Sequence, residues 1–124
     1  MDIEIMRYVL DTNVALYLLG GRLANPLPVG EVYLSVISEI EMLSYPTIPE
    51  AETLAIHQFL SQVTVIGIDE AVKQMTIALR KKYRLKLPDA IVCASVLSVN
   101  AILLSNDVQL NRITEISVNA VQIQ

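Results

Sequence analysis

Short runs of β-forming residues alternate with helical patterns along this chain, and the alternation limits the folds it can adopt. Strands are predicted at 5–10, 32–36, 63–68, 101–104 and 116–123, where β-branched and aromatic residues lie between turn residues. Helices are predicted at 14–19, 39–44, 50–60, 70–83 and 88–97, followed by one helical turn that ends at Arg112. The order βαβααβααβαβ predicts an α/β fold of three layers, α/β/α, with a central, mainly parallel sheet of about five strands.

Polar residues mark the expected starts of these helices. Thr12 or Asn13 is expected to cap the first helix, Ser38 the second and Asp69 the fourth. The fifth helix begins near Pro88, which suits the first helical turn.

Composition restricts the class of protein and the cell compartment that can be expected. The 124 residues are 53% hydrophobic, which predicts one folded domain over residues 1–124 and makes disorder improbable. No apolar run is long enough to span a membrane. The N-terminus carries Asp2 and Glu4 without a basic region, so no secretory signal peptide is expected. A single cysteine, Cys93, permits no internal disulfide and is typical of a reducing cytoplasm.

Two predicted strands end in acidic residues that are also good helix caps. Asp11 follows strand 5–10, and Asp107 follows strand 101–104 through Ser105 and Asn106. If these strands are neighbours, both carboxylates lie at the same edge of the sheet, where α/β folds bind their ligands. Taken singly, each residue is better explained as an N-cap than as a ligand.

Three further acids are candidates for the same site. Asp89 lies in the first turn of a strongly apolar helix, where the helix dipole alone would favour an acid. Glu39 and Glu41 are two residues apart, or about 200° around a helix, so only one of them can face the site. Periodicity does not choose between them.

Four stretches resemble, in order, the motif regions of a known family. They are Val-Leu-Asp-Thr-Asn at 9–13, Ser-Val-Ile-Ser-Glu-Ile-Glu-Met at 35–42, Leu-Pro-Asp-Ala-Ile-Val-Cys-Ala at 87–94 and Leu-Leu-Ser-Asn-Asp at 103–107. Together they resemble the PIN-domain family over nearly the whole chain, in particular the VapC-like toxins of bacterial toxin–antitoxin pairs. Two positions depart from the family pattern: Leu110 stands where an aromatic is usual, and Cys93 where alanine is common.

The resemblance implies a catalytic, metal-binding set of acids and polar residues beside them. The acids are Asp11, Glu41 (rather than Glu39), Asp89 and Asp107; the polar residues are Thr12, Ser105 and Asn106. Such a set implies hydrolysis of RNA phosphodiester bonds. Asp11, Asp107 and Asp89 would bind the metal, Glu41 would bind a second ion or act as general base, and the polar residues would contact the acids or the RNA.

The available ligands favour a hard cation. Clustered carboxylates bind Mg²⁺ or Mn²⁺ in preference to zinc. The other conventional ligands are His57, expected on a helix surface, and Cys93, expected in the core.

Charge is distributed unevenly. The net charge of −4 is unlike that of a generally basic nucleic-acid binder. Five of the nine basic residues nevertheless lie between Arg80 and Lys86. Lys81, Lys82, Arg84 and Lys86 are therefore candidates for binding the RNA backbone. The alternative is that cations gather at a helix C-terminus because of the helix dipole.

The expected partners follow from the resemblance: an RNA substrate, a cognate antitoxin and a second copy of the chain in a homodimer, with Val14, Leu18 and Leu19 as possible interface residues. No membrane contact and no DNA-binding element are expected. A PIN nuclease of RNA processing and a non-catalytic PIN-like binding module are alternatives. A haloacid-dehalogenase-like phosphatase is disfavoured because Asn13 stands where its second aspartate belongs, and a Rossmann domain because the first turn has no glycine.

Overall fold

A five-stranded parallel sheet forms the centre of the molecule. The computed structural model describes residues 4–124, so Asp2 lies outside the described residues. The strands are β1 (Arg7–Leu10), β2 (Glu31–Ser35), β3 (Thr64–Ile66), β4 (Ile102–Leu104) and β5 (Ser117–Asn119). They are arranged in the order β3-β2-β1-β4-β5, and all four neighbouring pairs are parallel.

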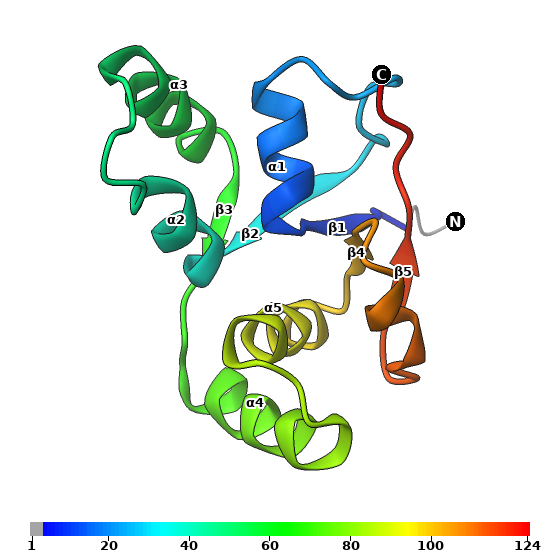
Figure 1. Cartoon of the computed structure of the whole chain (residues 1–124). Coiled ribbons are helices and arrows are strands. Elements are labelled where there is room, and N and C mark those ends of the chain that lie inside the picture. Colours follow the sequence, from blue (N-terminus) through cyan, green and yellow to red (C-terminus); the bar gives the residue numbers. More distant parts are fainter. Residues whose placement is uncertain (1–3) are drawn as a thin grey trace.

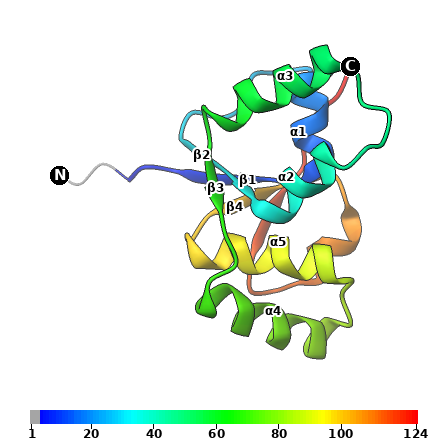
Figure 2. The ribbon, with the colours of Figure 1, turned by 90° about the vertical axis from the view of Figure 1, so that its left-hand side faces the viewer.

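Helices cover both faces of this sheet (Figures 1 and 2). On one face lie α1 (Thr12–Leu19), α2 (Val36–Leu43) and α3 (Glu50–Leu60); on the other lie α4 (Glu70–Tyr83) and α5 (Leu87–Ser98). A 3₁₀ helix, η1 (Val108–Arg112), connects β4 to β5. The predicted order of elements and the predicted three-layer α/β/α fold are therefore confirmed.

Alternation along β1 divides the core between the two faces. Val9 packs with α4 and α5, whereas Tyr8 and Leu10 pack with α1, α2 and α3. Successive side chains of a strand point to opposite faces of the sheet, so a strand covered by helices on both faces contributes alternate residues to two cores. Helix α5 lies between the sheet and α4, and seven of its residues are buried.

Several predicted boundaries were too generous. The strand predicted at 63–68 is limited to Thr64–Ile66, and the one at 116–123 to Ser117–Asn119. Beyond β5 the chain makes only an isolated antiparallel bridge, between Leu23 and Ile123. β2 ends at Ser35, which pairs with Ile66, and β4 ends at Leu104, which pairs with Asn119, so β3 and β5 end at the same level as their partners.

Two predicted helix caps were wrong. The first helix is capped by Asp11, whose side chain accepts a hydrogen bond from the backbone of Thr12. The second is capped by Ser35, whose hydroxyl accepts from Ile37 N–H, because α2 begins directly at the end of β2. Ser38 is instead a buried residue inside α2.

The suggested interface residues on α1 are mostly internal. Val14 is buried in the core, and Leu18 and Leu19 pack against that core. Among the described residues, no helix combines the length and apolar character needed to cross a membrane.

Candidate functional site

A cavity of about 350 Å³ opens at the carboxyl edge of the sheet. Figure 2 shows the end of β1, the starts of α1 and α5, and η1 on this side of the molecule. The cavity contains all four predicted acids, which come from four separate segments. Its lining is Asp11, Thr12, Asn13, Tyr17, Glu41, Tyr45, Asp89, Asn106 and Asp107.

Asp11 is the most firmly held of the four acids. Its Oδ1 accepts from the backbone N–H of Thr12 at 2.8 Å, and its Oδ2 accepts from the Ser105 hydroxyl at 2.6 Å. Its own N–H donates to the carbonyl oxygen of Leu104 at 3.0 Å. This last bond exists because β1 and β4 are adjacent and parallel, as the two strand-end acids required.

Ser105 joins Asp11 to Asp107. Its buried hydroxyl donates to Asp11 and accepts from the backbone N–H of Asp107 at 3.1 Å. Asp107 in turn begins η1, where its Oδ1 accepts from Gln109 N–H at 3.0 Å. The position of one acid thus depends on that of the other through a single side chain.

Glu41 is tied to the first motif through Thr12. The Thr12 Oγ1 lies 2.9 Å from Glu41 Oε1 and 2.8 Å from Ser38 Oγ. A carboxylate can only accept, so the Thr12 hydroxyl donates to Glu41 and the Ser38 hydroxyl can donate to Thr12. Glu39 does not line the cavity.

Asp89 lies in the first turn of α5, partly buried. Burial raises the pKa of this carboxyl, and the neighbouring charges of Asp107 and Asp11 raise it further. Lys86 acts in the opposite direction. Negative charge in the cavity is therefore incompletely compensated by the protein.

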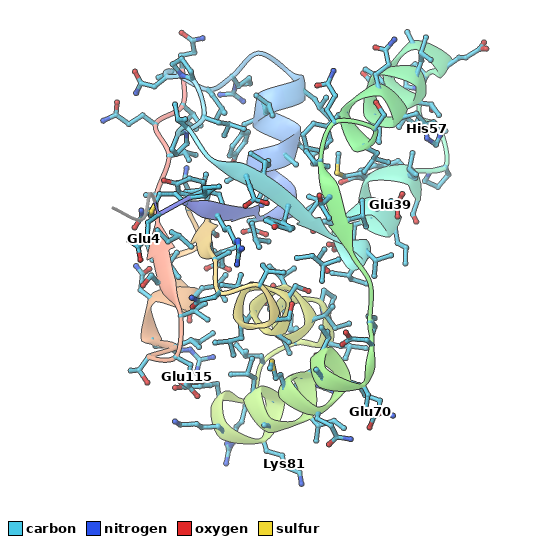
Figure 3. The ribbon with its side chains drawn as sticks, turned by 180° about the vertical axis from the view of Figure 1, so that it is seen from behind. Glu4, Glu39, His57, Glu70, Lys81 and Glu115 are labelled. Carbon is cyan, nitrogen blue, oxygen red and sulfur yellow. The ribbon has the colours of Figure 1, made fainter. Side chains whose placement is uncertain are left out.

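Cys93 lies one turn beyond Asp89 and is fully buried. Burial, followed by the charges of Asp89, Asp11 and Asp107, raises the pKa of its thiol to about 12. Cys93 is therefore a core residue, as predicted, and does not line the cavity. His57 lies exposed on α3 (Figure 3), away from the cavity.

The acids match a divalent cation in donor type and in charge. Carboxylate oxygens are the preferred ligands of Mg²⁺ and Mn²⁺, and uncompensated negative charge is what such an ion neutralises. Within residues 4–124, no three carboxylate, imidazole or thiol side chains already lie close enough to hold one ion jointly. The cavity therefore has suitable ligands, which must draw together to coordinate an ion.

The basic residues between Arg80 and Lys86, called the basic run below, do not lie together in the structure. None of Lys81, Lys82, Arg84 and Lys86 lines the cavity. Lys81 points outward from α4 (Figure 3), and Lys82 pairs with Glu115 at 3.3 Å. Arg84 ends α4 with a left-handed φ of 55° and so turns the chain. Lys86 precedes α5, and its charge acts on Asp89.

The sequence interpretation missed four residues near the acids. Asn13, Tyr17 and Tyr45 line the cavity, and Ser38 contacts Thr12. Helical spacing could have identified them: Tyr17 follows Asn13 by four residues, Tyr45 follows Glu41 by four, and Ser38 precedes Glu41 by three. Asn106 has a structural bond as well, since its Oδ1 accepts from Val121 N–H at 2.7 Å.

Comparison with known proteins identifies the family of this chain. The family model described as "PIN domain" matches residues 8–116. No curated protein matches the chain.

Solved structures of toxin–antitoxin complexes contain similar chains. One, a toxin–antitoxin complex from Klebsiella pneumoniae, is 26% identical with a TM-score of 0.73, covering 88% of this chain and 94% of the other. VapBC-1 from nontypeable Haemophilus influenzae is 25% identical with a TM-score of 0.72, covering 93% and 98%. VapBC2 from Rickettsia felis, bound to a promoter DNA fragment, has a TM-score of 0.79 and covers 94% of this chain and 100% of the other. Its sequence identity is 18%, so it supports the fold alone.

Proposed function

This chain belongs to the PIN-domain family, and from that premise we propose that it is a metal-dependent endoribonuclease and the toxin of a toxin–antitoxin pair. The observation that carries the proposal is the convergence of four carboxylates, from four separate segments, on one cavity at the carboxyl edge of the sheet. The similarity to chains from toxin–antitoxin complexes, one of them VapBC-1, supports the toxin role and an antitoxin partner.

In the proposed site, Asp11, Asp89 and Asp107 hold Mg²⁺ or Mn²⁺, and Glu41 binds a second ion or acts as general base on the attacking water. When bound, the cation neutralises charge on the phosphate and makes a water molecule more acidic. The pKa of Asp89 is raised first by burial and then by the charges of Asp107 and Asp11, and a bound cation would offset the second of these effects.

Hydroxyl groups between the acids hold the carboxylates in place for metal binding and catalysis. Ser105 fixes one oxygen of Asp11, and Thr12 fixes one oxygen of Glu41. Asp11 accepts one hydrogen bond on each oxygen and Glu41 one in all, so both carboxylates keep acceptor capacity for the cation or for the proton of the attacking water. Thr12 and Asn106 line the cavity and are the polar residues proposed to contact the RNA, whereas Ser105 is buried and acts through Asp11.

The nuclease is tested with Asp11→Asn, which removes the charge and keeps an oxygen to accept from Thr12. We expect it to abolish Mn²⁺-dependent cleavage of RNA while leaving the circular dichroism spectrum unchanged. Asp69→Asn is the matched control, because Asp69 also caps a helix, with Oδ1 accepting from Val72 N–H at 2.9 Å, but lies outside the cavity. Full activity of Asp11→Asn, or wild-type activity that persists in EDTA, would refute the proposal.

The toxin role is tested separately in cells. Expression of the chain alone should arrest bacterial growth, and Asp11→Asn should not. A nuclease that cleaves RNA without arresting growth belongs instead to RNA processing, and a chain without activity is a binding module. The proposal includes action on cytoplasmic RNA, neutralisation by a co-expressed antitoxin, and a homodimer, which sedimentation can test.

A further inference from the structure

Two tyrosines share the cavity with the acids and have no part in the proposed chemistry. Tyr17 lies one helical turn after Asn13 on α1, and Tyr45 lies two residues beyond the end of α2, four residues after Glu41. Both rings therefore belong to the wall formed by α1 and α2. Asp89 and Asp107, from α5 and the end of β4, form the opposite wall.

Tyr45 is exposed to a degree that core packing does not explain. Its side chain is 57% exposed, although its backbone is fixed by a turn in which Ile48 N–H donates to the Tyr45 carbonyl oxygen at 3.3 Å. A large ring held at the mouth of a polar cavity offers a flat apolar face to a ligand.

Tyr17 is half-buried and braced. The Arg22 guanidinium carbon lies 5.9 Å from the centre of its ring, within the range of a cation–π contact. The ring thus has a fixed position in the cavity wall before any ligand arrives.

Charge alone does not favour RNA at this cavity. Four carboxylates line it, the chain carries a net charge of −4, and the lysines at 81 and 82 are directed elsewhere. Beyond the attraction of a cation held by the acids, affinity for RNA then calls for a contribution that is not electrostatic. Stacking on aromatic rings supplies one, and it tolerates any sequence because every base has a π face.

We propose that Tyr17 and Tyr45 form a stacking platform for unpaired bases beside the scissile phosphate. This inference rests on the proposed nuclease function and assigns to Tyr17 and Tyr45 the positioning of the bases next to the scissile phosphate. The bases lie toward α1 and α2, and the backbone passes the acids. Bases in a duplex stack on one another and are inaccessible to the rings, so duplex RNA is a poor ligand.

The test measures binding, independently of cleavage. In an Asp11→Asn background, a short fluorescein-labelled single-stranded RNA of mixed sequence is titrated with protein and its anisotropy is followed. We expect Tyr45→Ala and Tyr17→Ala each to weaken binding by about tenfold, the loss of one stacked base. Tyr45→Phe and Tyr17→Phe should bind like the parent, because they keep the ring, and the annealed duplex should bind more weakly than the single strand.

Leu54→Ala is the matched control for Tyr45. Leu54 is 59% exposed on α3 and does not line the cavity, so its truncation should leave RNA binding unchanged. Circular dichroism verifies the fold of each variant, which matters most for the half-buried Tyr17.

Four results would overturn the platform. The first is unchanged RNA binding by Tyr45→Ala, and the second is an equal loss of RNA affinity in Tyr45→Ala and Tyr45→Phe. The third is equal affinity of the protein for duplex and single-stranded RNA. The fourth is that the alanine variants lose neutralisation by the antitoxin but keep RNA binding, which would assign the rings to a protein interface. In each case cleavage of RNA by the wild-type chain would leave the proposed function standing. Absence of wild-type cleavage would refute the proposed function itself.

Discussion

Removal of the Ser105 hydroxyl should destabilise the protein more than removal of any comparable buried hydroxyl. Ser105 is 2% exposed; its Oγ donates to Asp11 Oδ2 at 2.6 Å and accepts from Asp107 N–H at 3.1 Å. Ser105→Ala breaks both bonds and removes the link between the two strand-end acids.

The magnitude follows from the charge of one partner. A hydrogen bond to a charged group contributes about 1.5–3 kcal/mol to the free energy of unfolding. The bond from Asp107 N–H adds little, because Asp107 is exposed and water can replace the lost acceptor. The expected loss for Ser105→Ala is therefore about 2 kcal/mol.

Ser95→Ala is the control. Ser95 is equally buried, but its hydroxyl donates at 2.8 Å to Ile91 O, a neutral helix carbonyl. Alanine is the better helix former, so the change should stay within about 0.5 kcal/mol. Urea denaturation of both variants in EDTA measures the difference. If the two variants lose the same free energy, Ser105 does not stabilise the charge of Asp11 and the reasoning is wrong.

Two further predictions concern charge in and near the cavity. Because the folded state raises the pKa of Asp89, ionisation of this residue costs stability at neutral pH; that cost declines as the pH falls below the raised pKa and is gone below the pKa of the unfolded chain. In EDTA, Asp89→Asn should be more stable than wild type at neutral pH and should lose this advantage in acid. Added Mn²⁺ should stabilise wild type more than the variant. Urea denaturation across pH, with and without Mn²⁺, measures both effects. Lys86→Ala should reduce the salt dependence of RNA binding by about one unit of slope, whereas Lys81→Ala should not, because only Lys86 acts on the acids. Equal slopes for the two lysine variants would contradict this division of the basic run.

Local signals were sufficient for the order of the elements but not for their ends. Helix α3 begins and ends as predicted because its pattern is contained within its own residues. The strands at 63–68 and 116–123 were overestimated because their length depends on pairing with distant segments. Ser38 is a good cap by residue type, yet Ser35 holds that place because α2 starts where β2 ends.

The positions of the site residues required the three-dimensional fold for a similar reason. The sequence indicated that Asp11 and Asp107 follow strands, and only the adjacency of β1 and β4 brings them to one edge. The choice of Glu41 over Glu39 came from family resemblance, because helical spacing separates the two without saying which face is internal. Proximity along the chain was misleading for the basic run, since the left-handed turn at Arg84 reverses the chain between α4 and α5.

Asp11 shows that the roles of helix cap and metal ligand are compatible. The two roles were weighed as competitors, with the cap assigned to a neighbouring residue, yet Asp11 itself caps α1 through Oδ1 and accepts from Ser105 through Oδ2. A carboxylate offers about four lone-pair directions, so two bonds leave room for a cation. The cap holds the side chain in place, which lowers the entropic cost of metal binding. For that reason Asp11→Asn, which keeps one acceptor for the cap, separates charge from structure, whereas Asp11→Ala would remove both and make any loss of activity uninterpretable.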